Sequence, residues 1–176
     1  FDILKTELKD FPSIWIGYEQ AVLNLKHGKN LSFPSEFTEG KDSIVTNGLI
    51  WMGDVSFMEE QIAEKLALGF KCIKLKIGVD WPAEHEILKK LRQKYPADIL
   101  ELRVDANGGF SAENVSEVLQ QLADLQIHSI EQPIKAGNID VMAELCAETP
   151  VAIALDEELI GINDFEEKEN LLLKIN

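Results

Sequence analysis

Basic residues, cysteines and long apolar runs are all scarce in this sequence of 176 residues. Its 17 lysines and arginines are outnumbered by 31 aspartates and glutamates, which gives a formal net charge of −14. A field of this sign repels phosphate backbones and anionic membrane surfaces, so we expect neither nucleic acid nor a membrane as a partner. No apolar run approaches the roughly 20 residues of a membrane span, and the first ten residues lack a signal-peptide pattern.

The residues that most often bind metals or form redox centres are also few. Cys72 and Cys146 belong to no metal or redox motif, so we expect reduced, buried thiols in a cytoplasmic protein. His27, His85 and His128 also lie outside any motif, and we interpret each as structural or exposed. With 45% hydrophobic and 27% charged residues, the composition is typical of a globular chain with one core. The sequence starts without Met and stops without a completed element, which indicates a fragment.

The first forty residues differ in pattern from the rest. Apolar residues at helical spacing predict an amphipathic helix over 12–28, and glycine and proline interrupt the connector that follows it. From about residue 43, predicted strands alternate with predicted helices. The expected strands are 43–53, 72–78, 99–109, 127–133 and 150–157. The expected helices are 56–69, opened by a Ser56–Glu59 capping box, 80–94, 111–125, capped by Ser111, 139–148 and 163–175.

This alternation predicts an α/β fold with parallel strands and helical crossovers, as either a doubly wound sheet or a (β/α) barrel. The strand faces favour the barrel. In the second strand, Cys72, Lys74 and Lys76 share one face, and large aliphatic residues share the other. A small or charged face suits a barrel interior, whereas an aliphatic face suits contact with outer helices. Catalytic residues of such barrels lie at the carboxyl ends of the strands.

Three of the predicted strands end in a carboxylate, namely Asp105, Glu131 and Asp156. Left bare, these charges would repel one another, and a hard cation with oxygen ligands, Mg²⁺, resolves the repulsion. Lys74 and Lys76 end the preceding strand, where a nearby metal and other cations lower a lysine pKa and allow it to act as a base. One acid after a strand is usually a cap or a solvated turn residue, but the ordered set points to a site. The chemistry it implies is removal of a proton next to a carboxylate, with the resulting enediolate stabilised by the metal and the lysines.

Four motifs, "KLKIG", "RVDANGGF", "IEQPI" and "ALDE", resemble the enolase superfamily and its muconate-lactonizing-enzyme subgroup. Two further stretches, "TNGLIWMGD" and "PSIWIGYEQAVLNL", are more narrowly similar to the o-succinylbenzoate synthases of menaquinone biosynthesis. The resemblance implies a (β/α)₇β TIM-like barrel preceded by an α+β capping domain. Residues 1–40 would then be the C-terminal part of the capping domain and a connector, and residues 41–176 the first half of the barrel.

The resemblance also implies roles for individual residues. Lys76 would be the base and later the acid, Lys74 would stabilise the enediolate, and Asn107 would help to arrange the site. The ligands of Mg²⁺, or of Mn²⁺ in its place, would be Asp105, Glu131 and Asp156.

The implied reaction is a lyase step, dehydration of succinyl-hydroxycyclohexadiene carboxylate, a small-molecule carboxylate substrate. The family's other lysine should fall past residue 176, because Lys174 lies on the last predicted helix; we therefore expect this chain to be inactive alone. Other readings stay open: a dipeptide epimerase or another racemase or cycloisomerase of the subgroup, and a non-catalytic half-barrel binding module. A homo-oligomer is also left open.

Overall fold

The computed structural model describes residues 2–28 and 33–175, which form two compact units. The first unit contains the residues up to Val45 together with Ile162–Lys168, and the second contains Thr46–Gly161 and the residues from Glu169 on. Each unit is described by itself below.

Among its described residues, the first unit holds the helices α1 (Asp2–Glu7) and α2 (Pro12–His27) and the start of α7 (Phe165–Ile175). The predicted helix over 12–28 is confirmed, with proline in its first turn and Gly28, at φ +71°, directly after its end. No side chain of α2 is buried. Of the predicted connector, residues 29–32 lie outside the described residues, and residues 36–40 form turns.

The second unit is built on a sheet of five parallel strands in the order β1-β2-β3-β4-β5. The strands are β1 (Gly48–Ile50), β2 (Cys72–Lys76), β3 (Glu101–Asp105), β4 (Ser129–Glu131) and β5 (Ala152–Ala154). The helices that follow them are α3 (Val55–Ala67), α4 (Trp81–Lys94), α5 (Val115–Asp124), α6 (Ile139–Glu148), the 3₁₀ helix η1 (Glu157–Leu159) and α7 (Phe165–Ile175). Strands that pair in sequence order, without a reversal, are those of a barrel rather than of a doubly wound sheet. The predicted α/β class and the partial barrel are therefore confirmed.

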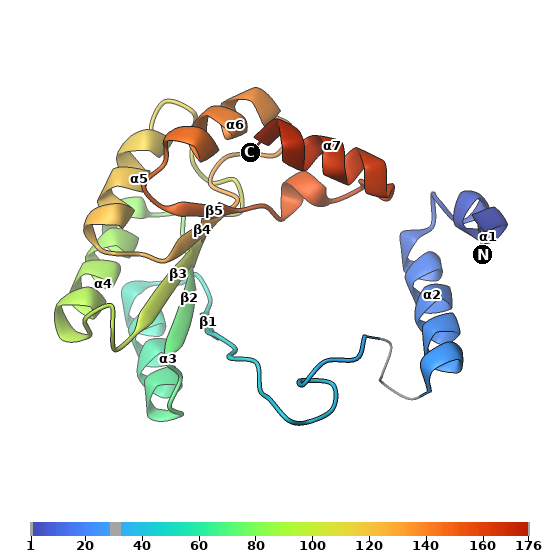
Figure 1. The fold of residues 1–176 in the computed structure, drawn as a ribbon. Coiled ribbons are helices and arrows are strands. Elements are labelled where there is room, and N and C mark those ends of the chain that lie inside the picture. Colours follow the sequence, from blue (N-terminus) through green and yellow to red (C-terminus); the bar gives the residue numbers. More distant parts are fainter. Residues whose placement is uncertain (1, 29–32, 176) are drawn as a thin grey trace. The chain divides into compact units, whose positions relative to one another are not determined.

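Helices α3 to α6 lie along one side of this sheet in Figure 1. Aliphatic side chains of β2, β3 and β4 are fully buried, among them Ile73, Leu75, Leu102 and Ile130. The helices contribute buried residues to the same core: Met58, Leu88, Leu122 and Met142. The predicted division into an aliphatic face and a small or charged face is thus what the structure shows for β2 and β3.

Several predicted boundaries are wrong. Residues 44–47 are not strand, so β1 is much shorter than the predicted 43–53. Asp54, not Ser56, caps α3: its carboxylate accepts a hydrogen bond from the Phe57 backbone N–H at 2.9 Å. Helix α5 begins only at Val115, because residues 112–114 form a turn before it. Of the two cysteines, Cys72 is buried but Cys146 is only half-buried, and both are free.

The turn after β3 requires glycine. Gly108 has φ +73°, and a Cβ placed on it would lie 2.9 Å from the Lys135 Cα. Asn107, just before it, also has a left-handed φ of +45°, which asparagine tolerates better than most residues. The tight turn lets the segment after β3 pair with the segment after β4, where Gly109 forms a bridge with Ile134.

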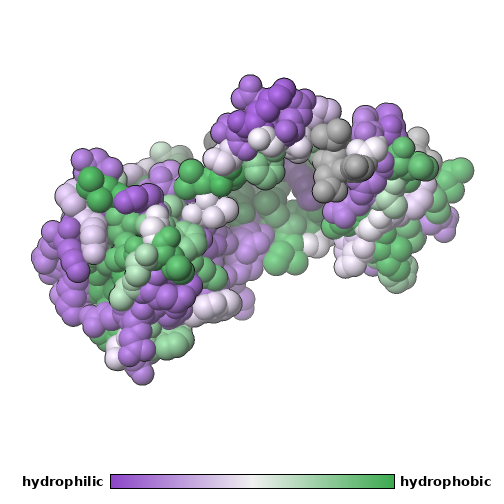
Figure 2. Space-filling view, turned by 90° about the horizontal axis from the view of Figure 1, so that it is seen from below, coloured by the Kyte–Doolittle hydropathy of each residue, from purple (hydrophilic) through white to green (hydrophobic). Residues whose placement is uncertain are grey.

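Polar and apolar areas are mixed on the face drawn in Figure 2. Exposed apolar side chains include Trp51, Phe57 and Val79, which lie on segments after β1 and β2. None of the described helices has both the length and the apolar character needed to cross a membrane.

Candidate active site

The strand register aligns the predicted site residues across neighbouring strands. Lys76 of β2 lies opposite Asp105 of β3, and Asp105 lies opposite Glu131 of β4. Lys74 lies two residues before Lys76 and on the same face. Because carboxyl ends of parallel strands meet at one edge, four charged side chains come together there.

Asp105 is the centre of the resulting ion-pair network. Its side chain is only 3% exposed. Its Oδ2 accepts from Lys76 Nζ at 3.0 Å and lies 3.4 Å from Lys74 Nζ, while its Oδ1 accepts from the Asn107 backbone N–H at 3.2 Å. Lys74 also donates to Glu131 Oε2 at 2.8 Å. Two ammonium groups therefore balance two carboxylates within one cluster.

Lys76 has two further neighbours. Its Nζ donates to Asn107 Oδ1 at 2.5 Å and lies 5.6 Å from the centroid of the Trp51 ring, within the range of a cation–π interaction. The backbone of Trp51 is held by Gln61 of α3. The Gln61 side-chain amide accepts from the Trp51 backbone N–H at 3.0 Å and donates to the Trp51 backbone carbonyl at 3.1 Å. Trp51 lies within the stretch "TNGLIWMGD", whose pattern predicted no role for it.

Burial alone would lower the pKa of the Lys74 ammonium. The hydrogen bond and charge of Glu131, together with the charge of Asp105, outweigh that effect, and the pKa of Lys74 is raised above its ordinary value. Carboxylate neighbours thus hold this lysine in its charged form, the opposite of the lowered lysine pKa expected beside a metal.

Gln132, in the "IEQPI" motif, fastens β5 and its following turn to the end of β4. Its side chain is fully buried, and its Oε1 accepts from the backbone N–H groups of Asp156 and Glu158, both at 3.2 Å. Its Nε2 donates to Glu158 Oε2 at 3.0 Å. This clamp keeps the backbone of Asp156 next to the residue that follows Glu131. This role of Gln132 was not predicted, and an amide between an acid and a proline at a strand end was the available signal.

The three predicted metal ligands differ in their surroundings. Asp105 is buried and Glu131 half-buried, whereas Asp156 is exposed. In residues 2–28 and 33–175, no group of three or more His, Cys, Asp or Glu side chains is arranged to hold a metal ion. The ligand assignment stays a prediction. The three histidines join no site: His27 and His128 are exposed, and His85 packs against Trp81 with ring centroids 5.2 Å apart.

Glu84 of α4 holds the loop after β2 and was missed by sequence reasoning. Its side chain is buried, and its two oxygens accept from the backbone N–H groups of Gly78, Val79 and Asp80 at 2.7, 3.2 and 3.1 Å. The loop starts two residues after Lys76, so Glu84 supports the carboxyl end of the strand that carries both lysines.

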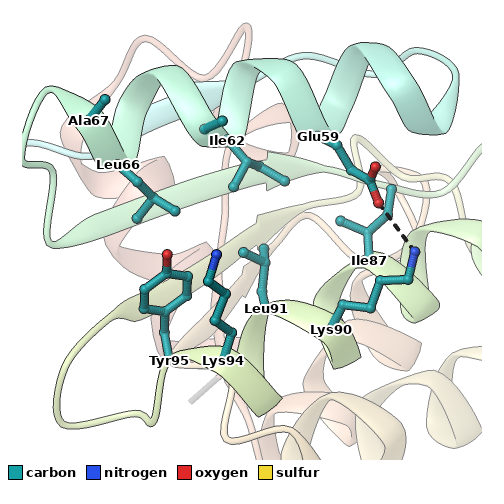
Figure 3. Close-up of a pocket in the computed structure, with 10 residues that line it drawn as sticks. Glu59, Ile62, Leu66, Ala67, Ile87, Lys90, Leu91, Lys94 and Tyr95 are labelled. Atoms are coloured by element: carbon teal, nitrogen blue, oxygen red, sulfur yellow. Dashed lines mark hydrogen bonds and ion pairs between the residues drawn. The ribbon is translucent and has the colours of Figure 1, made fainter.

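A cavity of about 530 Å³ lies between α3 and α4, with an apolar floor that includes Ile62 and Leu91. Figure 3 shows the Glu59–Lys90 ion pair at one end and Lys94 and Tyr95 at the other. No predicted site residue lines it. The charged cluster is instead at the strand ends, as expected of a barrel enzyme.

A parallel (β/α) sheet with paired lysines and carboxylates at its carboxyl edge has the form of the catalytic end of a (β/α) barrel, and fold and site together define the class of barrel enzymes. Comparison with protein families agrees with this class. Residues 58–168 match the family described as enolase C-terminal domain-like. The chain belongs to this family.

Two relatives narrow the likeness. Over 154 residues the chain is 49% identical to the o-succinylbenzoate synthase of Desulfotalea psychrophila, covering 86% of this chain and 42% of that protein. It is 28% identical over 123 residues to the hydrophobic dipeptide epimerase of Enterococcus faecalis, covering 70% of this chain and 34% of that protein. The chain thus spans less than half the length of either relative.

Solved structures of the same two kinds of enzyme rank in the same order of similarity to this chain. The crystal structure of MenC from Desulfotalea psychrophila matches with a TM-score of 0.71 and 47% identity, over 84% of this chain and 41% of that chain. That of dipeptide epimerase from Enterococcus faecalis matches with a TM-score of 0.65 and 26% identity, over 74% and 37%.

Proposed function

We propose that the intact protein is an o-succinylbenzoate synthase, a lyase of menaquinone biosynthesis that dehydrates succinyl-hydroxycyclohexadiene carboxylate. The observation that carries the proposal is the cluster of Lys74, Lys76, Asp105 and Glu131 at the carboxyl ends of β2, β3 and β4. The choice of substrate is supported by the 49% identity to the enzyme of Desulfotalea psychrophila.

Lys76 is the proposed base. Its Nζ already has Asn107 Oδ1 and Asp105 Oδ2 as acceptors, which orient it at the edge of the sheet. The neutral amine takes the proton alpha to the substrate carboxylate, and the pair of electrons from that C–H bond forms the new C=C bond. The C–O bond breaks, and the same lysine returns its proton to the leaving hydroxide as water. Lys74, which lies two residues before Lys76 on the same face of β2, supplies a fixed positive charge.

The residues present fit a divalent cation by their chemistry. Asp105, Glu131 and Asp156 offer only carboxylate oxygens, the donors that Mg²⁺ or Mn²⁺ prefers. Register places Asp105 beside Glu131, and Gln132 keeps the backbone of Asp156 near by. These three residues would hold the cation, which supplies positive charge next to the substrate carboxylate when bound.

Other features complete the proposal. We assign residues 1–40 to the C-terminal part of a capping domain and its connector, and residues 41–176 to the first half of the barrel. The free thiols of Cys72 and Cys146 support a cytoplasmic location. The partner is a small-molecule carboxylate, and neither nucleic acid nor a membrane is proposed.

The alternative is a dipeptide epimerase, favoured by the likeness to the enzyme of Enterococcus faecalis. It needs the same proton abstraction, so the cluster at the strand ends does not separate the two. A non-catalytic half-barrel binding module is a third reading, which the four charged side chains in contact argue against.

The test uses the intact protein with Mg²⁺ and offers it the cyclohexadiene and, separately, Ala-Glu dipeptides. We expect dehydration of the first, and no comparable epimerisation of the second. Lys76→Ala should abolish both dehydration and exchange of the alpha proton with solvent deuterium. Rapid epimerisation without dehydration would replace the named substrate but keep the mechanism. If the wild type shows neither dehydration nor epimerisation, the proposal is overturned.

A further inference from the structure

Glu157 has no role in the proposed mechanism, yet it is hydrogen-bonded to a residue that touches the proposed base. Its Oε1 accepts from Asn107 Nδ2 at 2.8 Å, and Asn107 Oδ1 in turn accepts from Lys76 Nζ at 2.5 Å. Glu157 is therefore joined to the lysine ammonium through one side-chain amide. The three residues come from η1, from the turn after β3 and from β2.

The two ends of this chain of hydrogen bonds fix the orientation of the Asn107 amide. An ammonium group can only donate, and an ionised carboxylate can only accept. While Lys76 is an ammonium group, the amide nitrogen of Asn107 must therefore face Glu157, and its oxygen must face Lys76. If Glu157 were absent or neutral, the flipped amide would also be allowed, and it would turn an N–H₂ group toward the ammonium.

Two observations indicate that Glu157 is held in place for this purpose. Its neighbours Asp156 and Glu158 both donate their backbone N–H to Gln132 Oε1, which anchors the segment on each side of it. Its second oxygen, Oε2, is buried without a hydrogen-bond partner among the described residues. With its backbone anchored on both sides and this oxygen buried, the Glu157 side chain has little freedom to move away from Asn107.

We propose that Glu157 is a positioning residue that selects the amide orientation of Asn107 and thereby keeps a hydrogen-bond acceptor on Lys76. As far as its effect on turnover is concerned, the inference rests on the proposed function. Its structural part, the locked amide, does not depend on which substrate the protein takes.

The structural part is tested in the intact protein with ¹⁵N-labelled asparagine. The side-chain amide signals of Asn107 are identified by their loss in Asn107→Gly, since glycine accepts the φ of +45° at this position. Glu157→Gln should move these signals, because a neutral amide replaces the charged acceptor. Glu148→Gln, a change at an exposed glutamate, should leave them in place. Coinciding Asn107 signals in the wild type and Glu157→Gln would overturn the proposal, whatever the activity.

The functional part is tested by a double-mutant cycle. Glu157→Gln should lower kcat by about 10- to 100-fold, the loss typical of groups that orient a functional side chain, with KM within about twofold. The same change in an Asn107→Gly background should have no further effect, because Glu157 acts through Asn107. An equal loss in both backgrounds, or a loss seen only in KM, would overturn the positioning role. If the wild type has no activity, the proposed function fails, and the amide signals alone decide.

Discussion

Replacing Asp105 by asparagine should unbalance the charged cluster while preserving its shape. In the wild type the Asp105 carboxylate accepts from Lys76 and from the Asn107 backbone N–H, and it forms an ion pair with Lys74 at 3.4 Å. An asparagine has one acceptor oxygen and an N–H₂ group, and every one of these neighbours is a donor. In Asp105→Asn, at least one donor must therefore face the new N–H₂ group, and two ammonium groups lose their shared counter-charge.

The cost can be bounded from the remaining contacts. Hydrogen bonds to charged groups contribute about 1.5–3 kcal/mol each. Lys74 keeps Glu131 at 2.8 Å and Lys76 keeps Asn107 Oδ1 at 2.5 Å, so we count the loss of one such bond rather than two. The free energy of unfolding should fall by roughly 2 kcal/mol. Asp98→Asn, at an exposed aspartate, should change it by less than about 0.5 kcal/mol.

The assay pairs denaturant unfolding with calorimetric titration of Mg²⁺ into the intact protein. If Asp105 is a ligand, the affinity for Mg²⁺ should fall by more than about tenfold, since changing even a residue that supports a ligand costs that much. Dehydration should fall with it. An Asp105→Asn protein that binds Mg²⁺ as the wild type does would refute the ligand assignment, and unchanged stability would refute the account of the cluster.

Three further changes have expected outcomes. Glu84→Ala removes the acceptor of three loop N–H groups and should lower the free energy of unfolding by about 3 kcal/mol in denaturant titrations. The stability of Glu84→Gln should lie between those of the wild type and Glu84→Ala. Equal stabilities of the three proteins would contradict the loop's dependence on this carboxylate. Gln61→Ala frees the backbone N–H of Trp51 and should speed the hydrogen exchange of this amide by about fivefold. An unchanged exchange rate would mean that another group protects the amide. Burial and a hydrogen bond to Glu101 raise the pKa of Cys72 from 9.0 to about 11. The unfolded thiol therefore loses its proton first, and the stabilisation that is complete below pH 9.0 is lost as the pH rises to about 11. Thermal midpoints over that range should fall more for the wild type than for Cys72→Ala, and parallel curves would exclude the effect.

The sequence predicts those parts of the fold that follow from local patterns. Helix α6 has the predicted bounds of 139–148, and α4 ends at the predicted residue 94. Alternation along β2 and β3 correctly separates the buried aliphatic face from the charged one. Strand lengths are less predictable, because a residue belongs to a strand only if a neighbouring strand reaches it, and β1 pairs over three residues only.

The parts of the site that sequence reasoning missed are side chains that bond to distant backbone or to distant side chains. Glu84 is on a helix, where a glutamate usually indicates a solvated face, and only the path of the preceding loop brings three N–H groups to it. The same holds for Gln132, whose side chain accepts from the backbone N–H groups of Asp156 and Glu158. These residues are 24 and 26 positions further along the sequence. Predicted strand ends located the lysines and carboxylates, but their partners depend on loop geometry, which no local pattern encodes.

The contacts of Lys76 suggest a role for Asn107, the asparagine two positions after Asp105. Both oxygens of Asp105 are engaged, Oδ2 by the lysines and Oδ1 by a backbone N–H. A cation that took Oδ2 would therefore compete directly with Lys76 for the same atom. Since Asn107 Oδ1 is a second acceptor for Lys76, the lysine can lose Asp105 and still be held in position. Asn107 keeps this role only while its amide oxygen faces the lysine, which is the orientation that Glu157 selects. On this reasoning, the charged cluster and its amide are two supports for one lysine, and removing both Asp105 and Asn107 should impair turnover more than the two single changes predict.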